Sequence, residues 1–174
     1  MNTPILETER LILRPFKETD LMDVYYGWET DEDVARYMFW TSHHDINRTK
    51  DFIRRELRKI SSDLWYRWAI VNKATNELIG TCLIYYDEYS KSNEVGYNLA
   101  KKFWGKGYTT EAMKRALVFA KEDLKWASIY GEHAKVNTAS ENVLKKLGFK
   151  YICDVPYDCG GKLHTEGKRW RLEL

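Results

Sequence analysis

The sequence has few cysteines and no excess of charge of either sign. Its 174 residues include Cys82, Cys153 and Cys159, an odd number in a chain long enough to fold without disulfide bridges. We therefore expect reduced thiols. The net charge is +2 with both signs interspersed, which argues against a nucleic-acid-binding protein and against a membrane-surface protein.

Long apolar runs, internal repeats and low-complexity tracts are also missing. No apolar run approaches the length that spans a membrane, and residues 1–4 open no apolar signal segment. His43 and His44 lack the spacing of metal ligands, so we expect surface histidines and no metal site. From these absences we predict a soluble, cytoplasmic protein with one domain over residues 1–174, whose hydrophobic fraction of 44% suits one core.

A glycine loop between a strand and a helix is the most informative stretch. Residues 94–99 alternate as a strand does, and Gly105 and Gly107 follow shortly before a segment with helical periodicity. A strand, a glycine loop and a helix start turn several backbone N–H groups toward one point, which is a binding site for a phosphate. The alternative is an ordinary loop that precedes a helix, because a short glycine pair is a weak motif.

A second stretch, residues 133–149, again runs from a strand into a helix. The first stretch reads Trp-Gly-Lys-Gly-Tyr-Thr-Thr-Glu-Ala over residues 104–112, and the second carries Asn137, Ser140 and the run Leu147-Gly148-Phe149. Together they resemble the GNAT superfamily of acyl-CoA-dependent N-acetyltransferases, and most closely its ribosomal-protein N-terminal (alanine) acetyltransferase branch. That branch has the motifs W-G-K-G-Y-A-T-E-A and N-x-x-S-x-x-V-L-x-K-L-G-F. The sequence departs from them at Thr109, where a smaller residue is usual.

The order of the predicted elements indicates an α/β (α+β) fold. Strands at 93–99, 128–134 and 151–155 alternate with helices, which requires some parallel pairing, whereas the earlier strands can pair as hairpins. We expect a mixed, strongly twisted central sheet flanked by helices, and a loop that contains proline and glycine up to residue 167. The resemblance implies that the parallel strands 93–99 and 128–134 splay apart.

The resemblance also implies acetyl-CoA as cosubstrate, with no metal. Its pyrophosphate would lie on the backbone of Gly105, Lys106, Gly107, Tyr108, Thr109 and Thr110. The pantetheine arm would lie between the splayed strands, where the backbone of Asn98 and Leu99 offers an N–H to the thioester carbonyl. Asn137 would contact the pantetheine, and it also suits a helix cap.

The resemblance assigns catalytic roles to Glu94 and Ser140. Glu94 would act as general base, directly or through water; the alternative is an exposed strand carboxylate. Many superfamily members use a tyrosine as the acid, but the corresponding residue is Leu144. Ser140 would instead donate a hydrogen bond to the leaving sulfur; the alternative is a serine of the first helical turn.

The resemblance implies that the acceptor pocket is walled by Met38, Phe39 and Trp40, although aromatic residues are more commonly core residues. We predict transfer of the acetyl group directly to a primary amine, chiefly a protein or peptide N-terminal α-amine. The alternatives are a small-molecule amine, such as an aminoglycoside, polyamine or amino-acid-like acceptor, and a non-catalytic acyl-CoA-binding module. The expected partners are acetyl-CoA and the amine, without nucleic acid or membrane, and a homodimer stays open.

Overall fold

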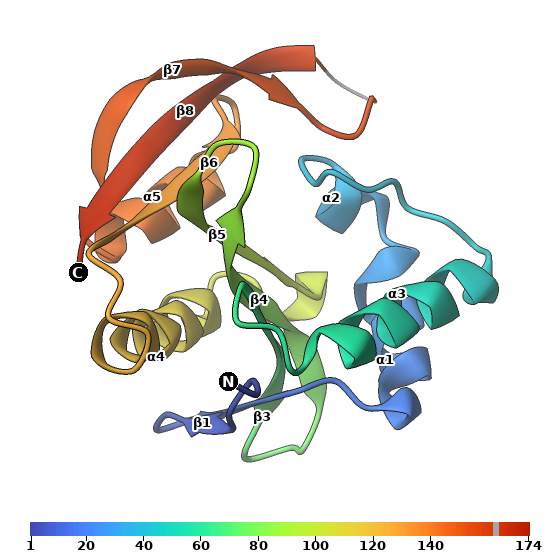
Figure 1. The fold of residues 1–174 in the computed structure, drawn as a ribbon. Helices are drawn as coiled ribbons and strands as arrows, with labels where there is room; N and C mark the ends of the chain where they lie inside the picture. Colours follow the sequence, from blue (N-terminus) through green and yellow to red (C-terminus); the bar gives the residue numbers. More distant parts are fainter. Residues whose placement is uncertain (162–163) are drawn as a thin grey trace.

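Eight strands form one mixed sheet in the order β1-β2-β3-β4-β5-β6-β8-β7 (Figure 1). The computed structural model describes residues 1–161 and 164–174. The strands are β1 (Leu6–Glu7), β2 (Leu11–Arg14), β3 (Trp65–Asn72), β4 (Leu78–Asp87), β5 (Ser92–Leu99), β6 (Ser128–Ala134), β7 (Lys150–Asp158) and β8 (His164–Glu173). The predicted mixed sheet flanked by helices is confirmed.

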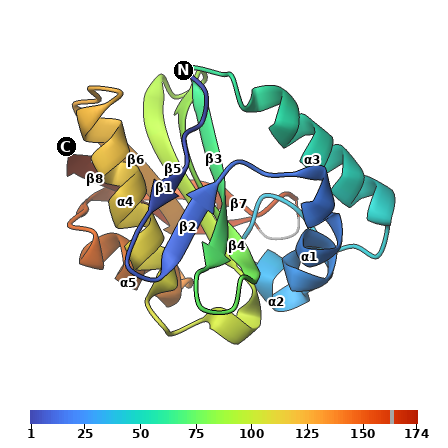
Figure 2. The same cartoon turned by 90° about the horizontal axis from the view of Figure 1, so that it is seen from below.

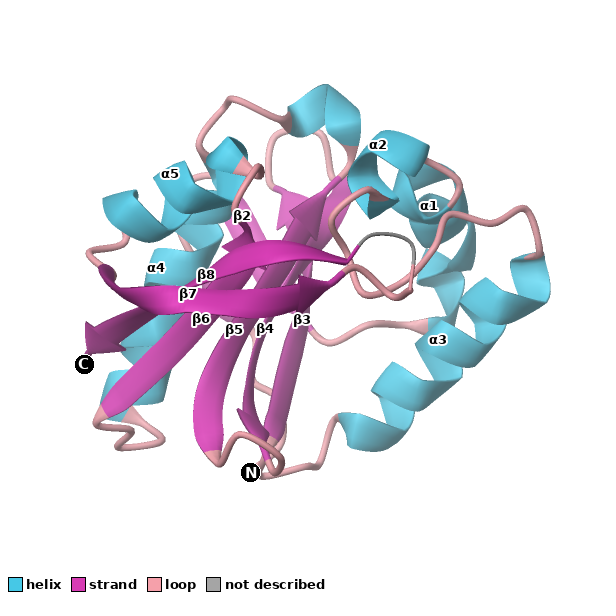
Figure 3. Cartoon of the chain, turned by 90° about the horizontal axis from the view of Figure 1, so that it is seen from above, coloured by secondary structure: helices cyan, strands magenta, loops and turns pink. Residues whose placement is uncertain are grey.

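Helices cover both faces of this sheet. The helices α4 (Tyr108–Glu122) and α5 (Thr138–Lys146) lie on one face. The other face carries α1 (Leu21–Val24), α2 (Glu32–Ala35) and α3 (Ile46–Lys59), as Figures 2 and 3 show. Asp45 caps α3 by accepting a hydrogen bond from the backbone N–H of Asn47.

The hydrophobic core is divided by the sheet into two clusters. The larger one packs α4 and the last turn of α5 against the sheet and includes Trp68, Met113 and Phe119, all nearly inaccessible to solvent. The smaller one, around Val24, Trp28 and Ile53, packs α1 and α3 on the other face. In the part of the chain that the structure describes, no helix is long and apolar enough to cross a membrane.

The strands β5 and β6 are parallel, and they separate along their length. Their pairing is confined to Glu94 with Tyr130, near the start of both strands. Leu144 of α5 packs over Gly131 of β6, where a Cβ atom would lie 2.9 Å from the leucine side chain. Because β5 and β6 diverge beyond Glu94, they leave an open split at their carboxyl ends, as the resemblance predicts.

The predicted loop up to residue 167 is wrong. The strand β7 continues to Asp158, and β8 already begins at His164, so these residues form a long hairpin that arches over the sheet (Figure 3). Pro156 pairs with Glu166 inside this hairpin. A proline is tolerated there because β7 is the edge strand, where a missing N–H breaks no bond to a further strand.

Candidate active site

A cavity of about 530 Å³ lies at the open end of the split between β5 and β6. It is lined by most of the residues that the resemblance assigns to the coenzyme. The predicted residues that line it are Met38, Asn98, Leu99, Gly105, Gly107, Tyr108, Thr109, Thr110, Asn137 and Ser140. Lys106, Glu94, Phe39 and Trp40 lie outside this lining.

The N-terminus of α4 is open toward the cavity. Gly107 precedes the helix with φ +80°, a left-handed conformation that glycine adopts without strain, and no side chain caps the first turn. In contrast, α3 and α5 begin with Asp45 and Asn137, whose side chains accept first-turn N–H groups. The free N–H groups of α4, with the positive end of the helix dipole, form an anion site of the kind that a pyrophosphate fits.

Arg10 and Glu111 connect the glycine loop to the N-terminal segment of the chain. The carboxylate of Glu111 accepts hydrogen bonds from the hydroxyl of Thr8 (2.6 Å) and from the backbone N–H and Nε of Arg10 (2.9 and 2.6 Å). The Arg10 guanidinium also donates to the carbonyl of Lys106 and lies 4.4 Å from the centre of the Tyr108 ring. Burial alone would raise the pKa of Glu111, but these hydrogen bonds hold it below its ordinary value.

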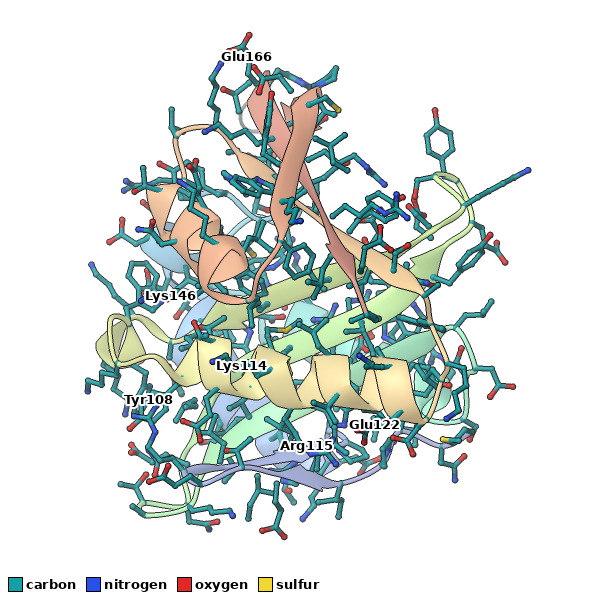
Figure 4. All side chains as sticks on the ribbon, turned by 90° about the vertical axis from the view of Figure 1, so that its left-hand side faces the viewer. Tyr108, Lys114, Arg115, Glu122, Lys146 and Glu166 are labelled. Carbon is teal, nitrogen blue, oxygen red and sulfur yellow. The ribbon has the colours of Figure 1, made fainter. Side chains whose placement is uncertain are left out.

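Basic side chains surround the mouth of the cavity. Lys146 and Arg36 line it, and Figure 4 shows Lys146 and Tyr108 toward the same side of the molecule. Lys101 and Lys102, which precede the loop, are engaged in ion pairs with Asp33 (2.5 Å) and Glu77 (2.8 Å). Arg36 is likewise paired with Asp33 (2.5 Å), so Lys146 is better placed than Arg36 or those two lysines to meet the phosphates of a coenzyme.

The end of β5 presents polar groups to the split. The N–H of Ala100 donates to Ile79 of β4, so strand alternation turns the N–H of Leu99 the other way, toward β6. This orientation favours Leu99 over Asn98 as the backbone donor to a thioester carbonyl. The side-chain amide of Asn98 is a feature that the sequence did not indicate: its nitrogen is buried with no hydrogen-bond partner among the described residues.

Ser140 and Asn137 form one hydrogen-bonded unit at the start of α5. The Asn137 side chain accepts a hydrogen bond from the Ser140 N–H (3.2 Å) and donates one to the Ser140 hydroxyl (3.1 Å). The predicted helix cap is therefore present, and the serine hydroxyl keeps its own proton to donate. Leu144 is 1% exposed and belongs to the core. A different tyrosine, Tyr97 of β5, lines the cavity, and its hydroxyl donates to the Ser140 carbonyl (3.3 Å).

Glu94 lies at the closed end of the split, within a cluster that the sequence did not reveal. One oxygen of its carboxylate accepts hydrogen bonds from Ser92 (2.6 Å) and from Arg169 of β8 (2.9 Å). Arg169 also donates to Glu132 of β6. Burial raises the pKa of Glu94, and the negative charge of Glu132 adds to this, while Ser92 and Arg169 oppose it. A carboxyl with a raised pKa is a better proton acceptor than an exposed one.

The three residues predicted to wall the acceptor pocket separate in the structure. Met38 lines the cavity, whereas Phe39 is 66% exposed and packs against Tyr157 of the β7–β8 hairpin, with ring centres 5.3 Å apart. Trp40 packs against the core cluster beside α1 and α3. Tyr157 also donates to the carbonyl of Tyr37, so the hairpin holds the segment that carries Met38.

The expectation that His43 is a surface residue is wrong. Its side chain is only 9% exposed, and its Nε2 lies 3.1 Å from a carboxylate oxygen of Glu29. Glu29 in turn accepts a hydrogen bond from the buried Thr49. The partner sits 14 residues away along the chain and is not visible as a motif. Among the described residues, no group of three or more potential ligands could hold a metal ion.

The splayed strands, the uncapped helix and the cavity between them are the architecture of an acyl-CoA-binding transferase. The comparisons with known proteins agree. The family model described as "Acetyltransferase (GNAT) domain" matches residues 10–150, so the chain belongs to the GNAT acetyltransferase family. It is 32% identical to the uncharacterized N-acetyltransferase p20 of Bacillus licheniformis over 146 residues, which are 83% of this chain and 82% of that protein.

Solved structures share the fold over almost the whole chain. RimL, a ribosomal L7/L12 alpha-N-protein acetyltransferase in complex with coenzyme A, superposes with a TM-score of 0.86 at 14% identity and covers 98% of both chains. The ribosomal-protein-S5-alanine acetyltransferase of Vibrio fischeri has a TM-score of 0.82 at 18% identity, covering 98% of this chain and 96% of that one. The protein is an N-acetyltransferase that uses acetyl-CoA.

Proposed function

We propose that the acceptor of the acetyl group is the α-amine at the N-terminus of a protein or peptide. The observation that carries this proposal is the base: Glu94 is a buried carboxyl with a raised pKa, held by Ser92 and Arg169. A carboxylate is a weak base for an amine. It is sufficient only where the acceptor loses its proton easily.

The acidity of the acceptor decides between amines. An α-amine with a pKa of about 8 costs about 1 kcal/mol to deprotonate at pH 7, whereas a lysine near 10.4 costs more than about 4 kcal/mol. A site with one weak base therefore suits an α-amine better than an unactivated lysine. The likeness to two ribosomal-protein acetyltransferases supports the fold of such an enzyme and makes a protein N-terminus the first acceptor to test.

Glu94 acts through water in this proposal. It is five residues from Leu99 along β5, about 16 Å at 3.3 Å per residue, which is beyond the reach of its side chain. The amine nitrogen attacks the thioester carbonyl carbon, its proton passes through water to Glu94, and the carbon–sulfur bond breaks. The N–H of Leu99 stabilises the carbonyl oxygen, and Ser140 donates a hydrogen bond to the departing sulfur.

An amine panel tests the proposal. The protein is mixed with acetyl-CoA and, in turn, an alanine-initiated peptide, the same peptide with a blocked N-terminus and one lysine, spermidine and an aminoglycoside, while free thiol is measured. We expect turnover with the free α-amine only. Turnover confined to spermidine or the aminoglycoside would show a small-molecule acetyltransferase, and tight coenzyme binding without turnover would show a binding module. The chain's three free cysteines fit a cytoplasmic enzyme, and that location remains a prediction.

A further inference from the structure

Two carboxylates, and not one, lie at the closed end of the split. Glu94 and Glu132 come from the neighbouring strands β5 and β6, and Arg169 of β8 donates to one oxygen of each. Among the hydrogen bonds of the described residues, none reaches the second oxygen of either carboxylate. The cluster thus offers two free acceptors and, with two carboxylates and one guanidinium, carries a net charge of −1.

Glu132 is the carboxylate nearer the coenzyme. Since Glu94 pairs with Tyr130, Glu132 stands two residues, about 7 Å, further toward the open end of the split. Its side chain is 29% exposed, compared with 9% for Glu94. By the same register it stands level with Gly96, which contributes no side chain to the space between the strands. An incoming group therefore meets Glu132 before it meets Glu94.

Tyrosine rings and further charged side chains surround the cluster. Tyr85 lies opposite Glu94 on β4, and burial raises its pKa to about 12, with Glu94, Asp87 and Glu132 adding to the effect. The Arg169 guanidinium is fixed over the Tyr130 ring at 4.5 Å. Other charges nearby are Asp87 at the end of β4 and Arg171, 5.7 Å from the Tyr130 ring. Arg169 is thus held in place on three sides.

We propose that Glu132 binds the ammonium group of the acceptor and that Arg169 is a positioning residue that holds Glu132 and Glu94 together. This inference rests on the proposed function. The acceptor arrives protonated, its ammonium donates to the free oxygen of Glu132, and the proton released before attack passes through water to Glu94. Arg169 holds the two carboxylates at this short separation by donating a hydrogen bond to each. The site accordingly accepts one positive charge.

Steady-state kinetics with an alanine-initiated peptide that has no other amine test the acceptor contact. Glu132→Gln should raise the KM for the peptide at least about tenfold, since it removes an ionic hydrogen bond, and change the KM for acetyl-CoA less than about twofold. An unchanged KM for the peptide would overturn the assignment of Glu132. Coenzyme titration and the melting temperature report whether each variant is folded.

The pH profile tests the role of Arg169, because Arg169 and Glu132 shift the pKa of Glu94 in opposite directions. Removing a cation raises the pKa of Glu94, so the acid limb of kcat/KM should move to higher pH in Arg169→Gln. Removing a neighbouring anion lowers this pKa, so the limb should move to lower pH in Glu132→Gln. Arg169→Lys should restore part of the profile, and the double variant should fall between the two single ones. Shifts in the same direction, or none, would leave Arg169 as a merely structural residue.

The two proposals fail separately. If the enzyme acetylates a small amine but not the peptide, the proposed function is wrong, and the same variants are measured with that amine. If the wild type acetylates the peptide while Glu132→Gln and Arg169→Gln behave as it does, only the present inference is wrong. If no amine of the panel is acetylated, the result counts against both.

Discussion

Glu94 and Ser140, the two side chains that the sequence assigns to the chemistry, lie in opposite surroundings. Ser140 lines the cavity and keeps a free hydroxyl proton, since its oxygen accepts from Asn137. Glu94 is buried, lies outside the lining, and accepts hydrogen bonds from Ser92 and Arg169. These surroundings fit the proposed roles, in which Ser140 contacts the sulfur directly and Glu94 exchanges a proton through water.

Replacement of Ser140 by alanine removes the hydroxyl that we propose donates a hydrogen bond to the leaving sulfur. We expect a loss of about 1–2 kcal/mol in the barrier, or roughly ten- to thirtyfold in kcat. The variant keeps the backbone N–H that Asn137 caps, so the melting temperature and the affinity for acetyl-CoA should change little. The defect should grow with an acyl donor whose thiol is more basic. A loss above roughly a thousandfold with intact binding would instead identify Ser140 as a true proton donor.

Glu94→Gln should slow the reaction mainly below the acceptor's pKa. At a pH well above about 8 an α-amine is already neutral, so the variant should approach the wild type there. The matched control is Glu88→Gln, which removes a carboxylate in the turn between β4 and β5. It should leave the profile of kcat/KM against pH unchanged. A loss that is the same at every pH would assign Glu94 to positioning, and no loss would remove it from the mechanism.

At the scale of elements, local sequence patterns predicted most helices and strands. They did not predict the side-chain contacts between residues far apart in the sequence. The strand at 128–134 and the cap at Asn137 follow from alternation and capping rules, which act over a few residues. The hairpin after residue 155 was missed because Pro156, Gly160 and Gly161 suggest a loop. In the structure Pro156 lies in an edge strand, which tolerates a proline, and the two glycines lie in the turn that follows. Arg169 reaches Glu94 across 75 positions, and no spacing rule reports such a contact.

A substitution at Gly107 tests whether the glycine loop binds the pyrophosphate of acetyl-CoA. Gly107→Val forces a β-branched residue to φ +80° and places it at the open start of α4, so acetyl-CoA should no longer raise the melting temperature. Gly161→Val is the control, because Gly161 has φ +77° with open space around it and lies at the hairpin turn. Both variants should lose stability, but only the first should lose the coenzyme. Normal acetyl-CoA binding by Gly107→Val would show that the loop is not the pyrophosphate site.

Gly80 tests the contact between β4 and the end of β5. A Cβ atom there would lie 2.4 Å from the Asn98 carbonyl oxygen and 2.9 Å from the Leu99 Cα, both backbone atoms that cannot turn aside. Gly80→Ala should cost about 1–3 kcal/mol, which lowers the melting temperature by roughly 2–10 °C. It should also weaken acetyl-CoA binding by displacing Leu99. In Gly96→Ala the new atom meets only Leu83, at 3.7 Å, and both quantities should stay near their original values.

At the scale of the whole molecule, the residues that bind and react come from distant parts of the chain. The glycine loop is held by Thr8 and Arg10 near the N-terminus, and the proposed base, Glu94, by Arg169 near the C-terminus. Family motifs mark only the middle of the chain, residues 104–149, so they locate the coenzyme better than the acceptor. This difference is why the cosubstrate is established by comparison and the acceptor remains a proposal.

The split between β5 and β6 also divides the molecule mechanically. Beyond one parallel pair, no sheet pairing in the described chain joins β1–β5 to the unit β6-β8-β7, which is tied to the rest by α4, α5 and side chains. Amide hydrogen exchange should therefore show two blocks, with the amides of β6 and β8 exchanging through a sub-global opening at a lower free energy than those of β3 and β4. Acetyl-CoA, bridging the split, should slow β6 and β8 the most. Identical exchange free energies for both blocks without coenzyme would show that the sheet opens as one unit despite its gap.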